Sequence, residues 1–592
     1  MDNKKFYKIL DSVFDRDRCF ERLCRIYDME KWNSYDEYKK NADYCVDQMK
    51  KMGLAEAEAK PMFADGVSVY NDKMVPPAWN ARSATLSFPN GEVLADYREI
   101  PCSLCMYSSA TPKGGIDAEV AGVDDISVIP EDGSLKGKLL LTSKPSAAVG
   151  EFACKVGAVG ILTDFFPLFP RVRDSRDEMK GVHRWDCLHP RKRGLFGFSL
   201  APEQGDMLRE MVKTQTVTLH AEVDAGDDEG ALYVISGMIP GTDPTLPDVM
   251  AYAHLDEPGA NDNASGAAGL LELGCCMTKA IEDGLLPRPK HNIRFIIGPE
   301  YSGSIGYFHY YPNRKSLCLC VADMIGNEDL DRTHMDVCLD PLASTSYVDA
   351  AILAANERYD DYAGTTHFVT TGPFWGGSDN IISDPSLETP SIAFMNYPAN
   401  SYHSSADSPE RIEPDILKRN AMIVGDFLYM VANADEDVCS MLADRLKKLE
   451  SSFDFENMTP RRAELIREST VRGLNSLKRL CNTYDPGVEL DEIEYDMPEF
   501  AKANGGERIP TRIHKGPIFF SAHPEIAADP AVKVDRYLPL FWTDGKRNIW
   551  EIAVRSAVEA RHDDDAYIAE HFSKLVKYFD VLASVGYTGW AK

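Results

Sequence analysis

The sequence predicts an α/β fold: a mostly parallel central sheet flanked by helices, an inserted β-rich domain and a small, mainly helical C-terminal module. Strands and helices alternate from residue 231 to about residue 435. Such alternation is typical of a mostly parallel sheet covered by helices. A stretch of short β-like runs precedes this region, and helical, charged segments follow it. The 592 residues also exceed what a single hydrophobic core accommodates.

These observations divide the chain into four parts. Residues 1–114 are the N-terminal part of the main domain with its connecting strands, and residues 115–230 are the insert. Residues 231–435 are the main α/β domain, and residues 436–592 are the C-terminal module. A winged-helix shape is one interpretation of this module, which we expect to serve packing or assembly.

Composition and charge restrict the partners of the chain. The 64 basic residues against 93 acidic ones give a net charge of −29, which repels nucleic acid and anionic membranes. No apolar run approaches membrane-spanning length, and the first residues lack the apolar core of a secretory signal. The 14 scattered cysteines fit a reducing compartment. We therefore expect a cytoplasmic protein that binds neither nucleic acid nor membrane, while homo-oligomerisation stays open.

The N-terminal region begins with helices and continues with short strands. Residues up to about 60 have helical periodicity, and a segment over 34–52 ends before Gly53 in the manner of a helix C-terminus. The helical spacing is carried by Ile9, Val13, Phe14, Phe20 and Leu23. β-like runs interrupted by Pro and Gly follow at 84–88 and 92–97.

The predicted insert combines strands with two helices. Its strands are expected at 136–142, 157–163, 197–199 and 216–223, and its helices at 147–156 and 202–213. The Gly-Lys strand, the segment Lys155-Val-Gly-Ala-Val-Gly-Ile and the short strand before the second helix resemble the protease-associated domain. A basic island from Arg171 to Arg193 lies inside the insert. It is either a solvated loop or a substrate-facing lid in which Arg191 and Arg193 bind substrate.

The main domain carries polar groups where its strands end. Strands are expected at 233–239, 249–253, 291–297, 317–322 and 391–395, and helices at 265–284, 347–358 and 412–434. The second strand runs into His254-Leu-Asp256 and a Gly/Pro/Asn loop before the helix. In open α/β sheets ligands bind at the carboxyl edge of the strands. Imidazole and carboxylate suit zinc, although His-x-Asp alone also fits a capped loop with a satisfied histidine.

Further candidate groups follow the other strands in a recognisable order. They are Asp262, Glu300, Asp323 and His403. Their motifs are Gly-Ala-Asn-Asp-Asn-Ala-Ser-Gly, Asp-Met-Ile-Gly and Tyr-His-Ser-Ser-Ala-Asp-Ser-Pro-Glu, and Ser378-Asp379 precedes the last strand. With the His-Leu-Asp motif, this order resembles the co-catalytic zinc exopeptidases, the group of aminopeptidase S, glutamate carboxypeptidase II and the transferrin receptor. The resemblance covers about residues 231–435 and the insert.

The resemblance implies a fold of the zinc exopeptidase type and a zinc site. Its implied ligands are His254, Asp262, Asp323 and His403. Asp262 would bridge two ions, and Asp256 would orient His254 from behind. Glu300 would take a proton from the attacking water and pass it to the leaving amine.

The sequence departs from the family after the third strand. The family has two consecutive glutamates, a base and then a ligand of the second metal, whereas this chain has Glu300-Tyr301. Gly303 and Gly306 keep the family spacing when Glu300 is the base, which leaves Tyr301 at the ligand position. The second ion is then weak or absent, or a tyrosine oxygen binds it. A shifted alignment makes Glu300 the ligand and puts Pro299 at the base position.

The resemblance implies a metal-dependent exopeptidase, with an aminopeptidase of small peptides as the leading interpretation and Zn²⁺, as one or two ions, as cofactor. One alternative is a metal-dependent hydrolase of another amide or an aminoacyl conjugate. Another is a non-catalytic binding homologue, as the transferrin receptor is within this group. The retained ligand set argues against the last, because a dead site has no physical need for it.

Overall fold

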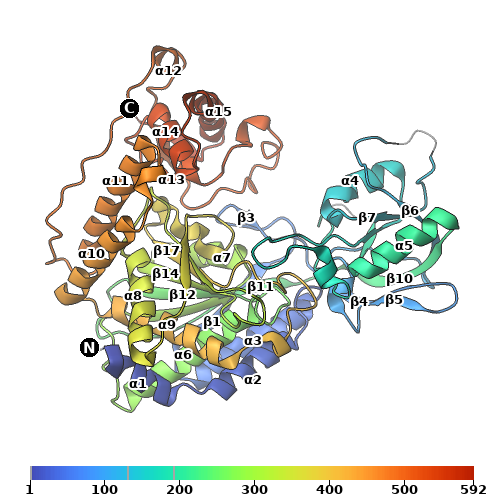
Figure 1. Ribbon diagram of the computed structural model, residues 1–592, viewed down its shortest axis with the longest axis horizontal. Coiled ribbons are helices and arrows are strands. Elements are labelled where there is room, and N and C mark those ends of the chain that lie inside the picture. The colour runs from blue at the N-terminus through green and yellow to red at the C-terminus, as the bar shows by residue number, and fades with distance from the viewer. Residues whose placement is uncertain (1–2, 130–132, 191–193, 592) are drawn as a thin grey trace.

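The computed structural model describes residues 3–129, 133–190 and 194–591, so Arg191 and Arg193 lie outside the described residues. The chain forms an eight-stranded sheet, a seven-stranded sheet and a C-terminal group of helices (Figure 1). Each of the three has its own cluster of buried apolar side chains. Among the described helices, none combines the length and apolar character needed to cross a membrane.

The eight-stranded sheet carries the main domain. Its order is β1 (Ala55–Phe63), β11 (Ala231–Ile239), β13 (Ile293–Gly298), β12 (Asp248–His254), β14 (Ser316–Asp323), β17 (Ser391–Met395), β15 (Met335–Cys338) and β16 (Val369–Gly372). The four central strands, from β13 to β17, are parallel. The pairs β1/β11, β11/β13 and β15/β17 are antiparallel.

The sheet is therefore mixed: its four central strands and the edge pair β15/β16 are parallel, and the other pairs are antiparallel. β11 joins β12 through residues 240–247 without a crossover helix, and a parallel connection needs such a crossover. Residues 55–63, predicted to belong to a mostly helical N-terminal region, form the edge strand β1.

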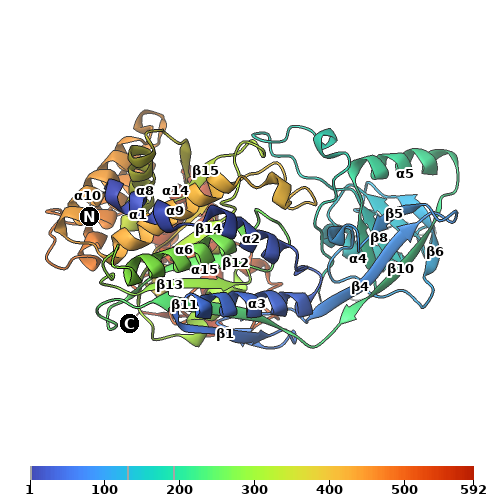
Figure 2. The same cartoon turned by 90° about the horizontal axis from the view of Figure 1, so that it is seen from below.

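Helices cover the sheet as the alternation predicts. Figure 2 shows several of them across one face: α2 (Arg16–Tyr27), α3 (Tyr35–Lys51), α6 (Ala264–Glu282) and α9 (Pro414–Ala432). α3 is capped by the Ser34 side chain and ends just before Gly53, as expected. α1 (Asn3–Val13) and α8 (Tyr347–Ala363) pack against each other at the side of this layer. α6 is buried along nearly its whole length, which agrees with its Ala- and Leu-rich sequence.

The seven-stranded sheet forms a separate lobe. Its order is β5 (Val93–Asp96), β4 (Trp79–Ser87), β10 (Thr218–Asp227), β6 (Ile116–Gly122), β7 (Leu139–Thr142), β8 (Gly160–Thr163) and β9 (Phe196–Ser199). Helices α4 (Ser146–Val156) and α5 (Pro202–Thr214) accompany it. β4 and β10 pair antiparallel from Trp79/Asp227 to Ser87/His220, so the chain enters and leaves the lobe through neighbouring strands. The sequence predicted that this lobe starts at residue 115. In the structure it starts at Trp79, the first residue of β4.

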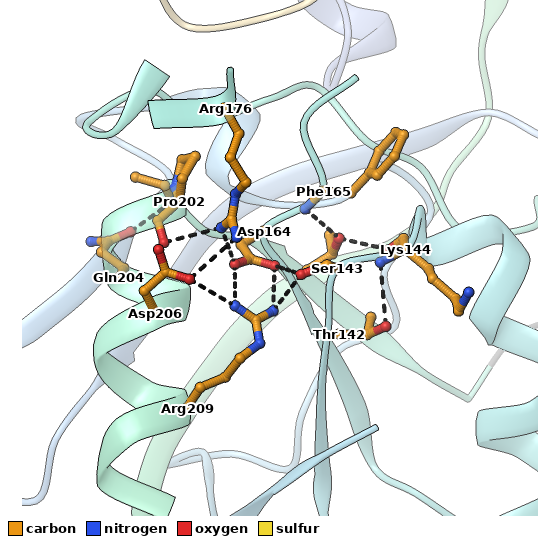
Figure 3. A network of polar contacts seen from close by, with 12 residues as sticks. Thr142, Ser143, Lys144, Asp164, Phe165, Arg176, Pro202, Gln204, Asp206 and Arg209 are labelled. Atoms are coloured by element: carbon orange, nitrogen blue, oxygen red, sulfur yellow. Dashed lines mark hydrogen bonds and ion pairs between the residues drawn. The ribbon is translucent and has the colours of Figure 1, made fainter. Parts of the chain in front are cut away.

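A buried carboxylate anchors the basic island to this lobe. Asp164, just after β8, receives two hydrogen bonds of 2.6 Å from the Arg209 guanidinium on α5 (Figure 3). Arg176, from the island, donates to the same carboxylate at 2.5 Å, and Ser143 donates at 2.9 Å. Bidentate charge-assisted bonds of this kind fix geometry as well as charge. Arg176 is thereby engaged in holding the fold of the lobe.

The C-terminal module packs onto the main domain through a short hairpin. It contains α10 (Glu436–Ser451), α11 (Pro460–Ser476), α12 (Glu499–Ala503), α13 (Leu538–Phe541), α14 (Ile549–Glu559), α15 (Asp565–Ser584) and the strand pair β18 (Pro510–Arg512)/β19 (Thr588–Trp590). Asp72, between β2 (Val69–Tyr70) and β3 (Lys73–Met74), accepts backbone N–H groups of Phe519, Phe520 and Ala522, and the Tyr587 hydroxyl. The winged-helix shape stays a prediction.

Candidate functional site

The four predicted ligands converge at the carboxyl edge of the central strands. His254 ends β12 and Asp323 ends β14. The His254 Nε2 atom lies 3.3 Å from Asp323 Oδ1 and 3.3 Å from Asp262 Oδ1. The other carboxylate oxygen of Asp262, Oδ2, lies 3.3 Å from Nε2 of His403. Asp262 therefore stands between two imidazoles.

Backbone hydrogen bonds fix the loop that carries Asp262. The carboxylate of Asp407 accepts the N–H groups of Asn261 at 2.7 Å and of Asp262 at 3.0 Å. Gly259 is required at the same place, because a Cβ there would lie 2.1 Å from Asp407 Oδ2. Asn263 caps α6 and donates to the Ala322 carbonyl of β14 at 3.0 Å, and the Asp262–Asn263 peptide bond is cis. The loop is thus tied to the neighbouring strand.

The charges in this site depend on one another. Burial raises the pKa of Asp262, but hydrogen bonds from His254 and His403 outweigh it and lower this pKa below its usual range. Burial lowers the pKa of His254, yet Asp323 and Asp262 raise it well above the ordinary value. Asp323 also accepts a hydrogen bond from the Ser378 hydroxyl at 2.7 Å. Two imidazoles among several carboxylates provide the donor set that a divalent cation balances.

Asp256 occupies a different place from the one expected. Its Oδ1 accepts the backbone N–H of Glu300 at 2.8 Å. The Nδ1 atom of His254 is buried and has no hydrogen-bond partner in the described part of the chain. The expectation that Asp256 orients His254 is therefore not met. Because Asp256 lies beyond the end of β12, its side chain reaches the segment after the adjacent strand, β13, and positions Glu300.

Glu300 and Tyr301 stand between β13 and α7 (Ser302–Tyr310), a helix that the sequence did not predict. Burial and the nearby charge of Glu257 raise the pKa of Glu300 well above its usual range. The Tyr301 N–H donates to Asp379 at 2.9 Å, and its hydroxyl lies 3.3 Å from the Gly376 carbonyl oxygen. The phenol is thus directed to a backbone carbonyl and not to the imidazoles.

Glu257 and Lys73 are residues near the site that no sequence motif predicted. Glu257 Oε1 lies 3.5 Å from His403 Nε2, and ligand atoms of His254, Glu257 and Asp262 all lie within 4.8 Å of one another. The one sequence feature that points to Glu257 is its position directly after Asp256 in the His-Leu-Asp motif. The second is Lys73, whose Nζ lies 4.3 Å from the Phe519 ring centroid. It is half-buried, and the charge of Glu300 acts on it.

The lobe reaches the site and forms one of its walls. The His403 ring stacks on Trp185 with centroids 4.8 Å apart and on Tyr402 with centroids 3.7 Å apart. The backbone N–H of Trp185 donates a hydrogen bond to the backbone carbonyl of His403 at 2.9 Å. Next to it, the backbone N–H of Ser405 donates to the His183 carbonyl at 2.8 Å. These contacts join the basic island to the loop that holds His403.

The arginines of the island that the structure describes are committed to structural contacts. Arg171 pairs with Asp336 at 2.7 Å, and Arg173 donates to the Asn400 carbonyl. The island therefore supports the site loop. The predicted substrate-binding residues Arg191 and Arg193 are among the residues that the structure does not describe.

Comparison with known proteins agrees with the sequence resemblance. Residues 235–428 match the model of Peptidase family M28. The fold is similar to a zinc aminopeptidase from Bacillus subtilis (19% identity, 71% of this chain and 96% of that one, TM-score 0.51). It is also similar to a putative peptidase from Clostridium acetobutylicum (14%, 99% of both chains, TM-score 0.51) and a Peptidase M28 precursor from Shewanella amazonensis (17%, 73% and 97%, TM-score 0.53). No curated protein matches the chain.

The family match confirms the predicted resemblance to zinc exopeptidases and the prediction of a metallopeptidase. Because the similar structures share less than 25% sequence identity with this chain, they support only the assignment of the fold. The similarity to the Clostridium acetobutylicum protein spans 99% of both chains, so it includes the C-terminal module.

The stacking of Trp185 on His403 predicts a role in metal affinity. Trp185→Ala leaves the backbone hydrogen bond but frees the imidazole to rotate, so zinc affinity should fall roughly 10-fold or more, as for other groups that orient a ligand. Competition with a chromophoric chelator measures this affinity. Trp185→Phe keeps a ring against the imidazole and should bind zinc nearly as the unmodified protein does. Unchanged affinity in Trp185→Ala would show that Tyr402 alone fixes His403.

Proposed function

Because residues 235–428 form a domain of Peptidase family M28, we propose that the protein is a metal-dependent aminopeptidase that hydrolyses the amide bond of small peptides. One observation carries the proposal. His254, Asp262, Asp323 and His403 come from distant parts of the chain, and their donor atoms meet at successive separations of 3.3 Å. Glu300 lies at the same sheet edge.

The donor set fits zinc. Zinc bonds of about 2.0–2.1 Å in tetrahedral geometry separate ligand atoms by about 3.3–3.4 Å. His254 Nε2 lies 3.3 Å from one oxygen of Asp262 and 3.3 Å from one oxygen of Asp323. These separations exceed the usual hydrogen-bond length of about 2.9 Å. One imidazole and two carboxylates therefore leave a fourth position for water or substrate.

The chemistry of hydrolysis divides between the metal and the chain. Bound zinc supplies a Lewis acid that polarises the amide carbonyl and acidifies water. Glu300 is the group that accepts the proton of the attacking water and delivers it to the leaving amine. Asp256 acts through the Glu300 N–H and keeps that carboxyl in place.

The charges around the site favour a peptide with a free amino end. Carboxyl groups of Glu257, Glu300 and Asp379 gather at the edge of the sheet, and a site rich in acidic groups attracts an ammonium group. Lys73 is a cation near Glu300: burial lowers the pKa of Lys73 below its ordinary value, and the charge of Glu300 raises it only in part. We infer that Lys73 binds the carboxylate end of a short peptide. Hydrolysis of another amide by the same groups is the alternative.

Two wider assignments accompany this function. The lobe of the seven-stranded sheet is proposed as a protease-associated domain, and its contact with the His403 loop through Trp185 supports a role beside the site. A cytoplasmic location is supported by the fourteen cysteines, which are all free thiols.

Removal of metal tests the function directly. Dialysis against a chelator should abolish hydrolysis of aminoacyl-anilides, because no other described group in the site polarises the carbonyl, and added zinc or cobalt should restore it. Peptides with a blocked amino end should not be cleaved. Full activity in protein shown by elemental analysis to be free of metal would contradict the proposal.

Replacement of the proposed base separates it from the ligands. Glu300→Gln should lower kcat by roughly 10²–10⁴-fold, the range typical of general acid–base catalysis, with zinc content unchanged. Steady-state kinetics and elemental analysis give the two readouts. Loss of zinc in this variant would instead make Glu300 a metal ligand, as in the shifted alignment.

Lys73→Met tests the proposed contact with the carboxylate end. A charge-assisted hydrogen bond contributes about 1.5–3 kcal/mol, so KM for dipeptides should rise roughly 10-fold or more. The matched control is the same dipeptide with an amidated carboxyl end, for which KM should stay unchanged. An equal rise for both substrates would mean that the variant disturbs the hairpin and that Lys73 does not bind the carboxylate.

A further inference from the structure

We propose that Glu257 is a ligand of a second metal ion, together with Asp262 and His403, and that it takes the role of the glutamate that Tyr301 replaces. This inference rests on the proposed function, because it concerns the same site. It reverses the expectation that the second ion is weak or absent.

The positions of the donor atoms carry the inference. His403 Nε2 lies 3.3 Å from Asp262 Oδ2 and 3.5 Å from Glu257 Oε1. Ligand atoms around a tetrahedral zinc ion lie about 3.3–3.4 Å apart, so the first separation matches this spacing and the second is slightly longer. The other oxygen of Asp262, Oδ1, lies 3.3 Å from His254 Nε2, and this nitrogen lies 3.3 Å from Asp323 Oδ1. The two oxygens of one carboxylate thus face two sets of donors, each with one imidazole and one further carboxylate.

Glu257 is buried, and its carboxyl shares a side-chain hydrogen bond with that of Asp262. The residue is 7% exposed, and no arginine or lysine in the described ranges pairs with it. Its one ion-pair contact is the imidazole of His403, which also faces Asp262. A buried carboxylate without a cation is costly, whereas a divalent ion at this place would balance both Glu257 and Asp262.

Tyr301 offers no comparable donor. Its hydroxyl lies 3.3 Å from the Gly376 carbonyl oxygen, and the Lys73 ammonium lies 5.8 Å from its ring centroid. Burial raises the pKa of Tyr301 far above its ordinary value, which disfavours the phenolate that a metal would require. The phenol therefore forms a wall of the site, and the carboxylate three residues after His254 fills the ligand position.

The metal content of purified protein tests the inference. After loading with zinc and gel filtration, elemental analysis should give two zinc ions per chain for the unmodified protein and one for Glu257→Gln. Cobalt titration followed by visible absorption should show the second binding event weakened roughly 10²-fold or more in the variant. Circular dichroism checks that Glu257→Gln is folded.

Tyr301→Phe is the matched control, since it removes the only oxygen by which residue 301 could replace the family glutamate. It should keep two ions. One ion in the unmodified protein, two equally tight ions in Glu257→Gln, or loss of an ion in Tyr301→Phe would each overturn the assignment. Metal content is independent of hydrolysis, so two ions without peptidase activity would contradict the proposed function and leave Glu257 as a ligand.

A measurement on the unmodified protein covers the case of a variant that does not fold. Crystals loaded with zinc should show two anomalous peaks, one of them within about 2.2 Å of a Glu257 carboxylate oxygen, the usual zinc–oxygen distance. Two peaks that both lie away from Glu257 would overturn the assignment.

Discussion

The carboxylate of Asp407 fixes the loop on which the candidate site depends. By accepting the N–H groups of Asn261 and Asp262, it sets the direction in which the Asp262 carboxylate leaves the backbone. Asp407 is 2% exposed, and burial raises its pKa to about 8, while the two backbone N–H groups act in the opposite direction and lower it. His254, Asp323 and His403 sit on elements that the fold places independently. Asp262 links these residues, because its two carboxylate oxygens each lie 3.3 Å from an imidazole nitrogen, one of His254 and one of His403.

Three separately packed parts of the chain meet at this edge of the sheet. The central strands provide His254 and Asp323, and the lobe places Trp185 against His403. The C-terminal module binds the Asp72 hairpin, which carries Lys73. The site therefore depends on packing between parts that are distant in sequence. This explains why the wall residues Trp185 and Lys73 could not be found from a motif.

The sequence predicts well what is encoded locally and poorly what depends on pairing. β17 has the predicted bounds, and the termini of α3 follow from Ser34 and Gly53. The ligand motifs were found because parallel strands bring their carboxyl ends together. β1 and the start of the lobe at Trp79 were missed, because both are defined by antiparallel partners more than 100 residues away in the chain. Glu257 was missed because its side-chain direction depends on the path of the loop, which no periodicity encodes.

In the proposed site, Glu257 takes the place of the glutamate that the family resemblance would put at Tyr301. A metal ion responds to the position and charge of a donor atom, and not to the strand from which the donor comes. The loop after β12 brings the Glu257 carboxylate beside His403, so this loop can supply the carboxylate. With Glu257 in that space, residue 301 is free to hold a large ring between Lys73 and Gly376. The proposed ligand Glu257 would then supply the charge that a second ion needs, while the Tyr301 hydroxyl lies against the Gly376 carbonyl.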